Sequence, residues 1–310
     1  DWFDETTRTG VIQQYNVSVS NGSDKGSSFF SLGYYKNLGI IKTSDFNRFS
    51  ARMNTEYKLL KNKMLTVGEH FTVNRTSEVQ APSGFLQNVL QFNPSLPIYT
   101  EDGNYAGPVG GYPDRYNPVA VLERNKDNRY TYWRMFGDAY LNINPFKGFN
   151  IRTTFGLDYS QKQQRIFTYP VTEGNVANSK NGVEAKQEHW TKWMWNAVAT
   201  YNMELGKNSI DLMAGMELNR EDDINFSGYK EGFSILNPDY MWPDAGTTNP
   251  QAYGGGSGYS LVSFFGKANY NYADKYMASF TIRRDGSSRF GKNNRYATFP
   301  SISVGWRINQ

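Results

Sequence analysis

The sequence has no cysteine, few purely aliphatic residues and no long apolar run, and each absence excludes a class of protein. Without cysteine there is no disulfide framework and no thiolate metal site. No run of about 18 apolar residues occurs, which excludes a transmembrane helix but not a membrane barrel, whose strands need only about 9–11 alternating residues. The charge of +4 is small for 310 residues and the Lys and Arg are dispersed, so no nucleic-acid surface is indicated.

The N-terminal stretch DWFDETTRTG has neither a basic segment nor an apolar one, so we expect no signal peptide. The chain reads as a mature protein or as a piece of a longer one.

Aromatic side chains make up an unusual share of the apolar residues. They account for 16% of the chain, while all hydrophobic residues together account for only 38%. Typical globular chains carry roughly 45–50% apolar residues. This mixture favours an apolar outer surface around a wet interior over a packed globule.

Alternation of apolar and polar residues recurs along the chain, and helical periodicity is almost absent. In 276–282 the apolar face carries Tyr276, Ala278, Phe280 and Ile282, and in 302–308 alternate residues are again apolar. About eleven strands are predicted, several of them longer than the 5–6 residues usual in soluble sheets. The predicted strands cover roughly residues 11–20, 28–36, 45–58, 63–74, 132–143, 149–159, 193–203, 210–218, 262–272, 276–282 and 302–308.

Short turns and long connections alternate strictly between these strands. The short turns fall at about 21–26, 59–62, 144–148, 204–208 and 273–274, and the long connections at 37–44, 75–128, 164–186, 225–256 and 286–295. An up-and-down barrel in a bilayer has this pattern, with its short turns on the periplasmic side and its long loops outside. The predicted fold is therefore all-β, an antiparallel up-and-down transmembrane β-barrel, with residues 1–10 outside the cell.

Eleven strands cannot close a bacterial single-chain barrel, which has an even number of strands. An open sheet edge in lipid would also leave backbone groups without hydrogen-bond partners. We therefore expect the chain to be part of a larger barrel.

Two blocks of sequence resemble SusC/RagA-type TonB-dependent outer-membrane transporters. The first is DWFDETTRTG with the following QQYNVSVSNGSDKGSSFFSLGYYKNLGIIKTSDFNRFSARMN, and the second is RRDGSSRFGKNNRYATFPSISVGWRI at 283–308. The resemblance extends over essentially the whole chain. It implies that residues 1–310 cover about strands two to twelve of a 22-stranded barrel whose plug lies outside this sequence.

The resemblance also implies a function and partners. Such transporters reside in the bacterial outer membrane and import large nutrients, usually glycans or peptides. They use energy from the TonB complex, and a SusD-like lipoprotein usually caps their outer face. By this resemblance the partners would be membrane lipid, that lipoprotein, the TonB complex and an oligosaccharide or peptide substrate, with no cofactor.

The long loops supply the candidates for substrate contact. The 75–128 loop is rich in Pro, Gly and Tyr, and its aromatic content argues against disorder. Tyr99, Tyr105, Tyr112 and Tyr116 are candidates to stack on a sugar or peptide, and Trp242 of the 225–256 loop is a fifth. Self-packing of the loops or contact with the capping lipoprotein is the alternative role for these rings.

The basic loop RRDGSSRFGKNNR is interpreted as a structural latch. Arg283, Arg284, Asp285 and Arg289 are predicted to fix this loop against neighbouring loops or the lumen wall, with Asp285 paired to nearby arginines. An anion site in this cluster is the alternative. Gly286 and Gly291 are expected to permit tight backbone turns.

No catalytic or metal-binding constellation is recognisable. His70 and His189 lack acidic or cysteine neighbours at metal-ligand spacing and are expected to be wet strand residues. GGGSG at 254–258 is expected to be a flexible loop and not a phosphate cradle. The carboxylates at 221–223 are expected to form a solvated face after a strand end.

The leading functional hypothesis is active import, and the protein is not expected to be an enzyme. An outer-surface glycan-binding or adhesin β-protein without transport is the runner-up, and a secreted β-rich glycoside hydrolase is a remote third. A plug upstream of residue 1 would separate the first two, and a requirement for detergent would separate both from the hydrolase.

Overall fold

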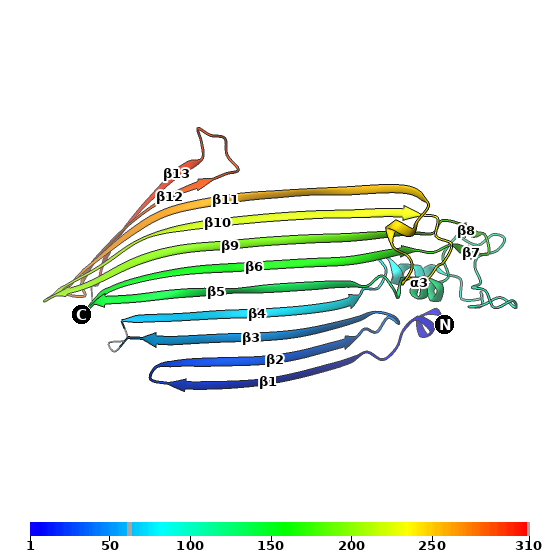
Figure 1. The fold of residues 1–310 in the computed structure, drawn as a ribbon, viewed down its shortest axis with the longest axis horizontal. Helices are drawn as coiled ribbons and strands as arrows, with labels where there is room; N and C mark the ends of the chain where they lie inside the picture. The colour runs from blue at the N-terminus through cyan, green and yellow to red at the C-terminus, as the bar shows by residue number, and fades with distance from the viewer. Residues whose placement is uncertain (61–63, 309–310) are drawn as a thin grey trace.

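One antiparallel sheet of eleven strands dominates the computed structural model, which describes residues 1–60 and 64–308. Each strand pairs with the next, and the order along the sheet follows the sequence, so the sheet is an up-and-down meander (Figure 1). The predicted fold class, strand number and strand order are confirmed. The strands are β1 (Val11–Ser23), β2 (Gly26–Leu38), β3 (Asp45–Leu59), β4 (Leu65–Val79), β5 (Tyr130–Phe146), β6 (Phe149–Thr168), β9 (Gly182–Leu205), β10 (Asn208–Glu231), β11 (Thr248–Tyr272), β12 (Tyr276–Ser287) and β13 (Tyr296–Trp306).

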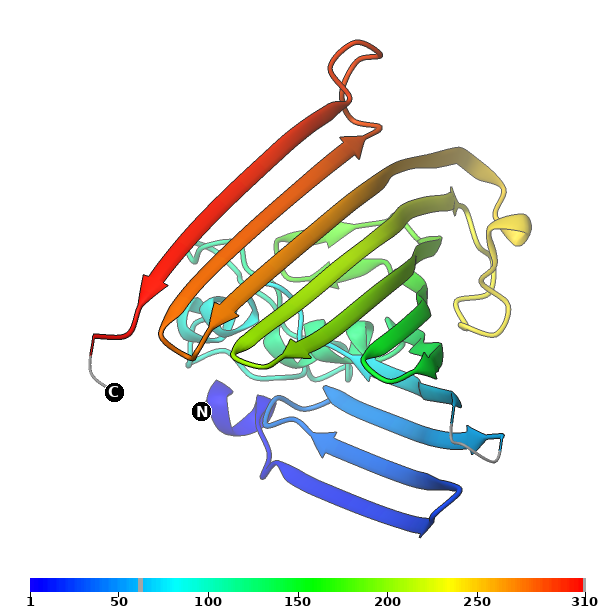
Figure 2. The ribbon, with the colours of Figure 1, turned by 90° about the vertical axis from the view of Figure 1, so that its left-hand side faces the viewer.

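The sheet is curved, and within the described residues it does not close. β1 and β13 lie at its two ends, with the remaining strands curving between them (Figure 2). The short turns gather at one end of the strands and the longer connections at the other (Figure 1). Residues 61–63, which include part of the predicted 59–62 turn and the start of the predicted 63–74 strand, lie outside the described residues.

The register places the alternating residues on two chemically different faces. Leu141, Thr153, Ala197, Met216 and Phe264 pair successively across five strands and so share one face. The residues between them, such as Asn196 and Glu217, occupy the opposite face. The first set forms an apolar face and the second a polar one, as a wall between lipid and water requires.

The last hairpin has the faces that the sequence predicts. Phe280 lies opposite Ile302 on the apolar face, and Ser279 lies opposite Ser303 on the polar face. At the short-turn end the rings of Tyr272, Tyr276 and Trp306 stack in sequence at centroid distances of 6.4 Å. Such a row of rings is typical of an interfacial aromatic girdle.

The wall is much taller in its middle than at its ends. β9, β10 and β11 have 24, 24 and 25 residues, whereas β1 has 13 and β13 has 11. The GGGSG stretch lies inside β11 and pairs with β10, so its assignment to a flexible loop is wrong. The carboxylates at 221–223 likewise lie within β10 and not after a strand end. The long connections are correspondingly shorter than expected, because β6, β9, β10 and β11 continue past the alternating segments.

The connections at the long-loop end contain short elements of their own. Among the described residues, no helix has the length and apolar character needed to cross a membrane. The elements are α1 (Trp2–Thr6), α2 (Phe85–Gln91), α3 (Pro118–Asn125), the hairpin β7 (Val171–Glu173) with β8 (Val176–Asn178), and the 3-10 turn η1 (Pro243–Ala245). Residues 1–10 lie at this end, because Thr7 bridges to Ile41 between β2 and β3.

Candidate functional site

The helices of the 80–129 connection lie over the mouth of the curved wall. In Figure 2, viewed from the short-turn end, they project inside the curve of the sheet, and in Figure 1 they stand at the far end of the strands. A small apolar core joins them to the N-terminal helix: Trp2, Phe85, Val89, Phe92 and Leu122 are all buried together. We call α1, the whole 80–129 connection with α2 and α3, and the β7–β8 hairpin the loop cap.

Asn117 is the residue that organises the loop cap. It is fully buried and caps α3, with its Oδ1 accepting hydrogen bonds from the amides of Val119 (3.0 Å) and Ala120 (3.3 Å). Its Nδ2 donates to the carbonyls of Ile98 and Ala106, both at 2.9 Å. One side chain therefore fixes the start of α3 and the 98–106 segment relative to each other.

Glu173 fastens the β7–β8 hairpin to the same point. Its carboxylate is 1% exposed and accepts from the backbone amide of Asn117 at 2.7 Å and from the Arg124 guanidinium at 2.6 Å. Gly107 lies so close that an added Cβ would sit 2.1 Å from the carbonyl oxygen of Glu173. Two connections separated by a strand pair thus pack as one unit, which the sequence pattern does not reveal.

The four candidate tyrosines all belong to this loop cap. Tyr99 and Tyr105 face each other across a backbone bridge with ring centroids 5.3 Å apart. Tyr112 and Tyr116 are 41% and 44% exposed, and the Arg124 guanidinium lies 6.0 Å from the Tyr116 ring. Burial, helped by the neighbouring Tyr99, raises the pKa of Tyr105. The cap therefore presents several half-exposed rings at the mouth of the wall.

Trp242 lies on the other side of the wall from these tyrosines. Its loop packs through Phe233 and Met241 onto Phe167 and Val183, which belong to the apolar face. Figure 2 shows the same loop (yellow) outside the curve of the sheet. The Trp242 ring is 52% exposed and lies 4.1 Å from the Arg165 guanidinium. The structure does not bring Trp242 together with the tyrosine candidates.

Two of the predicted latch residues form an ion pair on the polar face of β12. Arg283 Nε lies 2.7 Å from Asp285 Oδ1, and Arg283 Nη2 donates to Ser263 Oγ at 2.9 Å. The expected pairing of Asp285 with a neighbouring arginine is confirmed. Both side chains are about 40% exposed (43% and 37%), so the pair contributes modestly to stability.

The other two latch residues are directed elsewhere. Arg284 lies on the apolar face, 5.1 Å from the Tyr296 ring, while Arg289 in the connecting loop lies 4.1 Å from the Tyr259 ring of β11. Backbone contact reinforces the second link, because the Ser288 amide donates to the Ser260 carbonyl at 3.0 Å. The four residues therefore form three separate contacts and not one basic cluster.

Gly286 has a different role from the one expected. It lies within β12 opposite Tyr296, and an added Cβ would sit 2.4 Å from that ring. Gly291 meets nothing within 4 Å, and neither glycine has a positive φ. Room for a tyrosine ring, and not turn geometry, requires glycine at position 286.

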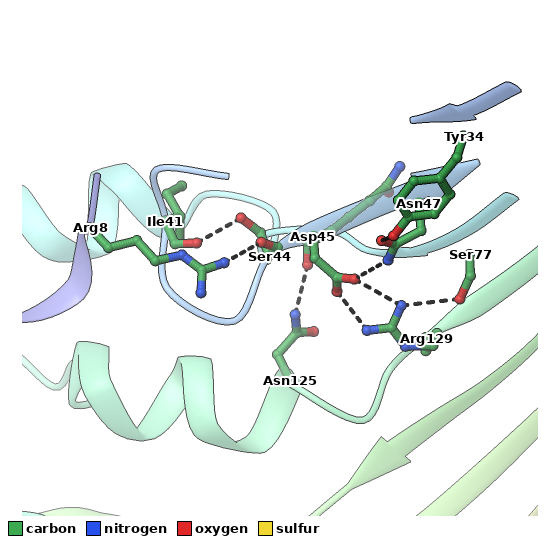
Figure 3. Close-up of polar contacts among 10 residues, drawn as sticks. Arg8, Tyr34, Ile41, Ser44, Asp45, Asn47, Ser77, Asn125 and Arg129 are labelled. Atoms are coloured by element: carbon green, nitrogen blue, oxygen red, sulfur yellow. Dashed lines mark hydrogen bonds and ion pairs between the residues drawn. The ribbon is translucent and has the colours of Figure 1, made fainter. Parts of the chain in front are cut away.

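At the long-loop end of the wall, which we call the rim, a polar cluster connects β3, β4 and the 80–129 connection (Figure 3). The Arg129 guanidinium donates to both carboxylate oxygens of Asp45, at 2.6 and 3.1 Å, and to Ser77 Oγ at 3.1 Å. Asn47 Nδ2 donates to Asp45 at 2.7 Å. Arg8 donates to the Ser44 carbonyl at 2.6 Å, which holds the N-terminal segment at the same rim.

Ion pairs and cation–π contacts line the polar face of the wall. Arg134 and Asp158 pair at 2.6 Å, His70 lies 3.2 Å from Asp138, and the Arg152 guanidinium lies 3.8 Å from the Tyr140 ring. Within the described ranges, no three His, Asp or Glu side chains gather as a metal site would require. The polar face is suited to contact with water and polar ligands.

Comparisons with known proteins bear on the identity of this wall. No protein-family model matches the chain. The TonB-dependent receptor SusC of Bacteroides thetaiotaomicron is 29% identical over 340 aligned positions, which include all of this chain and 32% of that receptor. TonB-dependent receptor P3 of Formosa agariphila is 32% identical, over 99% of this chain and 31% of that receptor. The chain thus spans about a third of the length of these relatives.

Solved structures agree with the sequence comparison. The RagAB peptide transporter superposes with a TM-score of 0.81 at 21% identity, over 99% of this chain and 35% of that one. The ferric citrate transporter FecA superposes with a TM-score of 0.58 at 7% identity. The predicted resemblance to SusC/RagA-type TonB-dependent receptors is confirmed along the whole chain, and the barrel-wall fold with it.

Proposed function

We propose that this chain is one part of the barrel of a SusC/RagA-like transporter, which imports large nutrients across the bacterial outer membrane with energy from the TonB complex. The observation that supports it most directly is the tall meander with one apolar and one polar face, in a chain whose whole length aligns with TonB-dependent receptors. Energy coupling and closure of the barrel would be carried by regions outside residues 1–310. The chain would act through its wall and its loop cap.

We further propose that the loop cap contacts an oligosaccharide or peptide substrate. Aromatic rings stack on sugar rings and on peptide planes, and Tyr99, Tyr112 and Tyr116 are 41–50% exposed at the mouth. Tyr105 supports Tyr99 through ring contact. Trp242 is left out of this proposal, because its loop lies outside the curve of the wall.

A SusD-like lipoprotein is the proposed partner at the same mouth. The RagAB structures are those of a peptide transporter or importer with open-open and closed-closed states. A lid over this chain would meet the loop cap first, since the cap stands beyond the strand ends (Figure 1). Residues 283–289 would act as a latch that holds the β12–β13 loop against β11, through the contacts of Arg289 with Tyr259 and of Ser288 with Ser260.

Placement in the membrane is tested by spin labels at 278–281 in the full-length protein, reconstituted in bilayers. Ala278 and Phe280 are expected to be accessible to a lipid-soluble quencher, and Ser279 and Thr281 are not. Loss of this alternation would contradict the proposal. A non-transporting adhesin would show the same alternation but no TonB-dependent uptake into cells.

Substrate contact is tested by binding of two probes to the full-length protein, a tryptic digest of casein and a ladder of maltooligosaccharides. Tyr112→Ala and Tyr116→Ala are expected to weaken binding of one probe about tenfold each, the usual range for loss of a stacked ring. Tyr270→Ala serves as the control, because Tyr270 is similarly exposed (42%) but lies on the apolar face of β11 near its short-turn end, opposite Ile210. Unchanged binding in both cap variants would remove these tyrosines from the site.

A further inference from the structure

An apolar groove of about 570 Å³ runs across the apolar face of β1 to β5. Ala51 forms its floor, and larger side chains of the same face, including Tyr34, Phe49 and Val73, stand around it. The register explains the depression, because the small Ala51 lies between Leu32 and Val73 in a row of bulkier residues. The groove is within the size range of small-molecule sites.

Two basic side chains lie toward the long-loop end of this groove: Arg75 lines it, and Lys36 lies on the same face two residues beyond the groove-lining Tyr34. Arg75 lies opposite Phe49 and Trp133, with its guanidinium 5.7 Å from the Trp133 ring. Lys36 lies on the same face of β2, opposite Asn47. Within the part of the chain that the structure describes, neither residue forms an ion pair.

The carboxylate of Asp45, on the same face of β3 near the rim, is engaged by other residues. Asp45 is held by both nitrogens of the Arg129 guanidinium and by Asn47, as Figure 3 shows. Below the rim the face turns apolar, and Tyr34 marks the change, since its ring lines the groove and its hydroxyl reaches Asn47 at 3.5 Å. Free positive charge therefore stands directly above an apolar slot.

We propose that this groove is a specific site for an anionic, phosphate-bearing membrane lipid. One acyl chain would lie in the slot above Ala51, and the phosphate would meet Arg75 and Lys36. A cation that faces lipid is costly unless it is paired, and a phosphate at the headgroup level supplies both the charge and the hydrogen-bond acceptors. The aromatic rings of Tyr15, Tyr34 and Trp133 have the amphipathic character of side chains that sit at this level.

This inference rests on the proposed placement of the apolar face in a membrane. The test is native mass spectrometry of the full-length protein, titrated in detergent with phosphatidylglycerol or with phosphatidylcholine of the same acyl chains. The wild type is expected to retain one phosphatidylglycerol at a concentration about tenfold lower than that needed for phosphatidylcholine. Equal retention of the two lipids would overturn the proposal.

Two variants separate the slot from the charge. Ala51→Phe fills the slot and is expected to abolish the tightly held lipid, whereas Arg75→Gln is expected to remove the preference for phosphatidylglycerol without removing lipid altogether. The matched controls are Ala268→Phe, on the apolar face of β11, and Lys275→Gln, next to the Tyr276 ring at the short-turn end of the wall. Both variants are expected to bind lipid as the wild type does. Retention of the preference by Arg75→Gln, or binding by Ala51→Phe equal to wild type, would also overturn the site.

The spin-label experiment at 278–281 distinguishes the two possible failures. If accessibility alternates but the lipid preference is absent, the lipid site is wrong and the membrane placement stands. If accessibility does not alternate, the placement fails and the lipid site falls with it.

Discussion

Replacing Glu173 by glutamine is expected to loosen the loop cap without affecting the wall. The carboxylate is 1% exposed and accepts from both Arg124 and the Asn117 amide. Removing one member of a buried ion pair costs about 3–5 kcal/mol. The Arg124 side chain retains 21% exposure, and glutamine can still accept from the Asn117 amide, so the lower end of that range, about 3 kcal/mol, is expected.

The assay is hydrogen exchange of the full-length protein in detergent, followed for the peptide that covers residues 115–125. The amides of Val119, Ala120 and Val121 are hydrogen-bonded through Asn117, which Glu173 holds in place. A loss of about 3 kcal/mol corresponds to exchange roughly 100-fold faster at these amides, if they open with the cap. Peptides from β9 and β10 are expected to exchange as in the wild type.

Glu123→Gln is the matched control. Glu123 lies on the same helix and pairs with Lys126, but both side chains are 48% exposed. Such surface pairs contribute about 0–1 kcal/mol, so exchange is expected to change by less than about fivefold. Equal exchange of residues 115–125 in Glu173→Gln and the wild type would refute the view that the carboxylate holds the cap together.

Three further changes test other parts of the structure. Burial, with added effects of the Asp127 charge and hydrogen bond, raises the pKa of Tyr169 to about 12 from 10. The contribution of the protonated Tyr169 to stability is therefore complete below pH 10 and is lost as the pH rises through 12. Asp127→Asn is expected to lower this pKa in ¹³Cζ-tyrosine NMR but to keep it above 10, because burial is the largest cause. Gly137→Ala would place a Cβ 2.0 Å from the His70 carbonyl oxygen and is expected to impair barrel assembly, measured by a heat-modifiability gel. The control Gly156→Ala, whose Cβ would lie 3.7 Å from its nearest neighbour, is expected to assemble normally. Equal assembly of the two variants would show that the sheet relaxes around position 137. Arg289→Ala removes the contact with the Tyr259 ring and is expected to raise the rate of hydrogen exchange in residues 288–295 a few-fold. Lys292→Ala in the same loop, for which no such ring contact is described, is expected to leave this rate unchanged. Similar exchange rates in the two variants would argue against the latch.

The sequence predicts the wall well, because the pattern that defines it is local. Each strand between lipid and water alternates residue by residue, so Phe280 and Ile302 could be assigned to one face before their pairing was known. The same reasoning fails where the strands extend beyond the alternating segments. On the apolar face of β10 the positions after Leu218 are Arg220 and Asp222, which interrupt the alternation. The glycines at 254–256 of β11 carry no side chain to alternate, although both segments are paired strand.

The loop cap could not be predicted because its contacts connect distant residues through polar atoms. Asn117 and Glu173 are 56 positions apart, and neither a buried asparagine nor a buried glutamate has a sequence signature. The only local signal was the N-cap pattern of Asn117 before Pro118 at the start of α3. Trp242 illustrates the same limit, since an aromatic residue in a long loop does not reveal toward which face the loop folds.

In the proposed transporter, the unequal height of the wall would shape the path by which a large molecule reaches the mouth. β11 continues from Thr248 to Ser260 beyond its pairing with β12, which at about 3.3 Å per residue is a step of about 40 Å along the strand. In the proposed transporter a diffusing ligand would meet a low rim over the β12–β13 hairpin and a high one along β9 to β11. Encounters from the low side would then lead directly to the rings of the loop cap, and the outline of the rim would select the direction of capture before any contact is made.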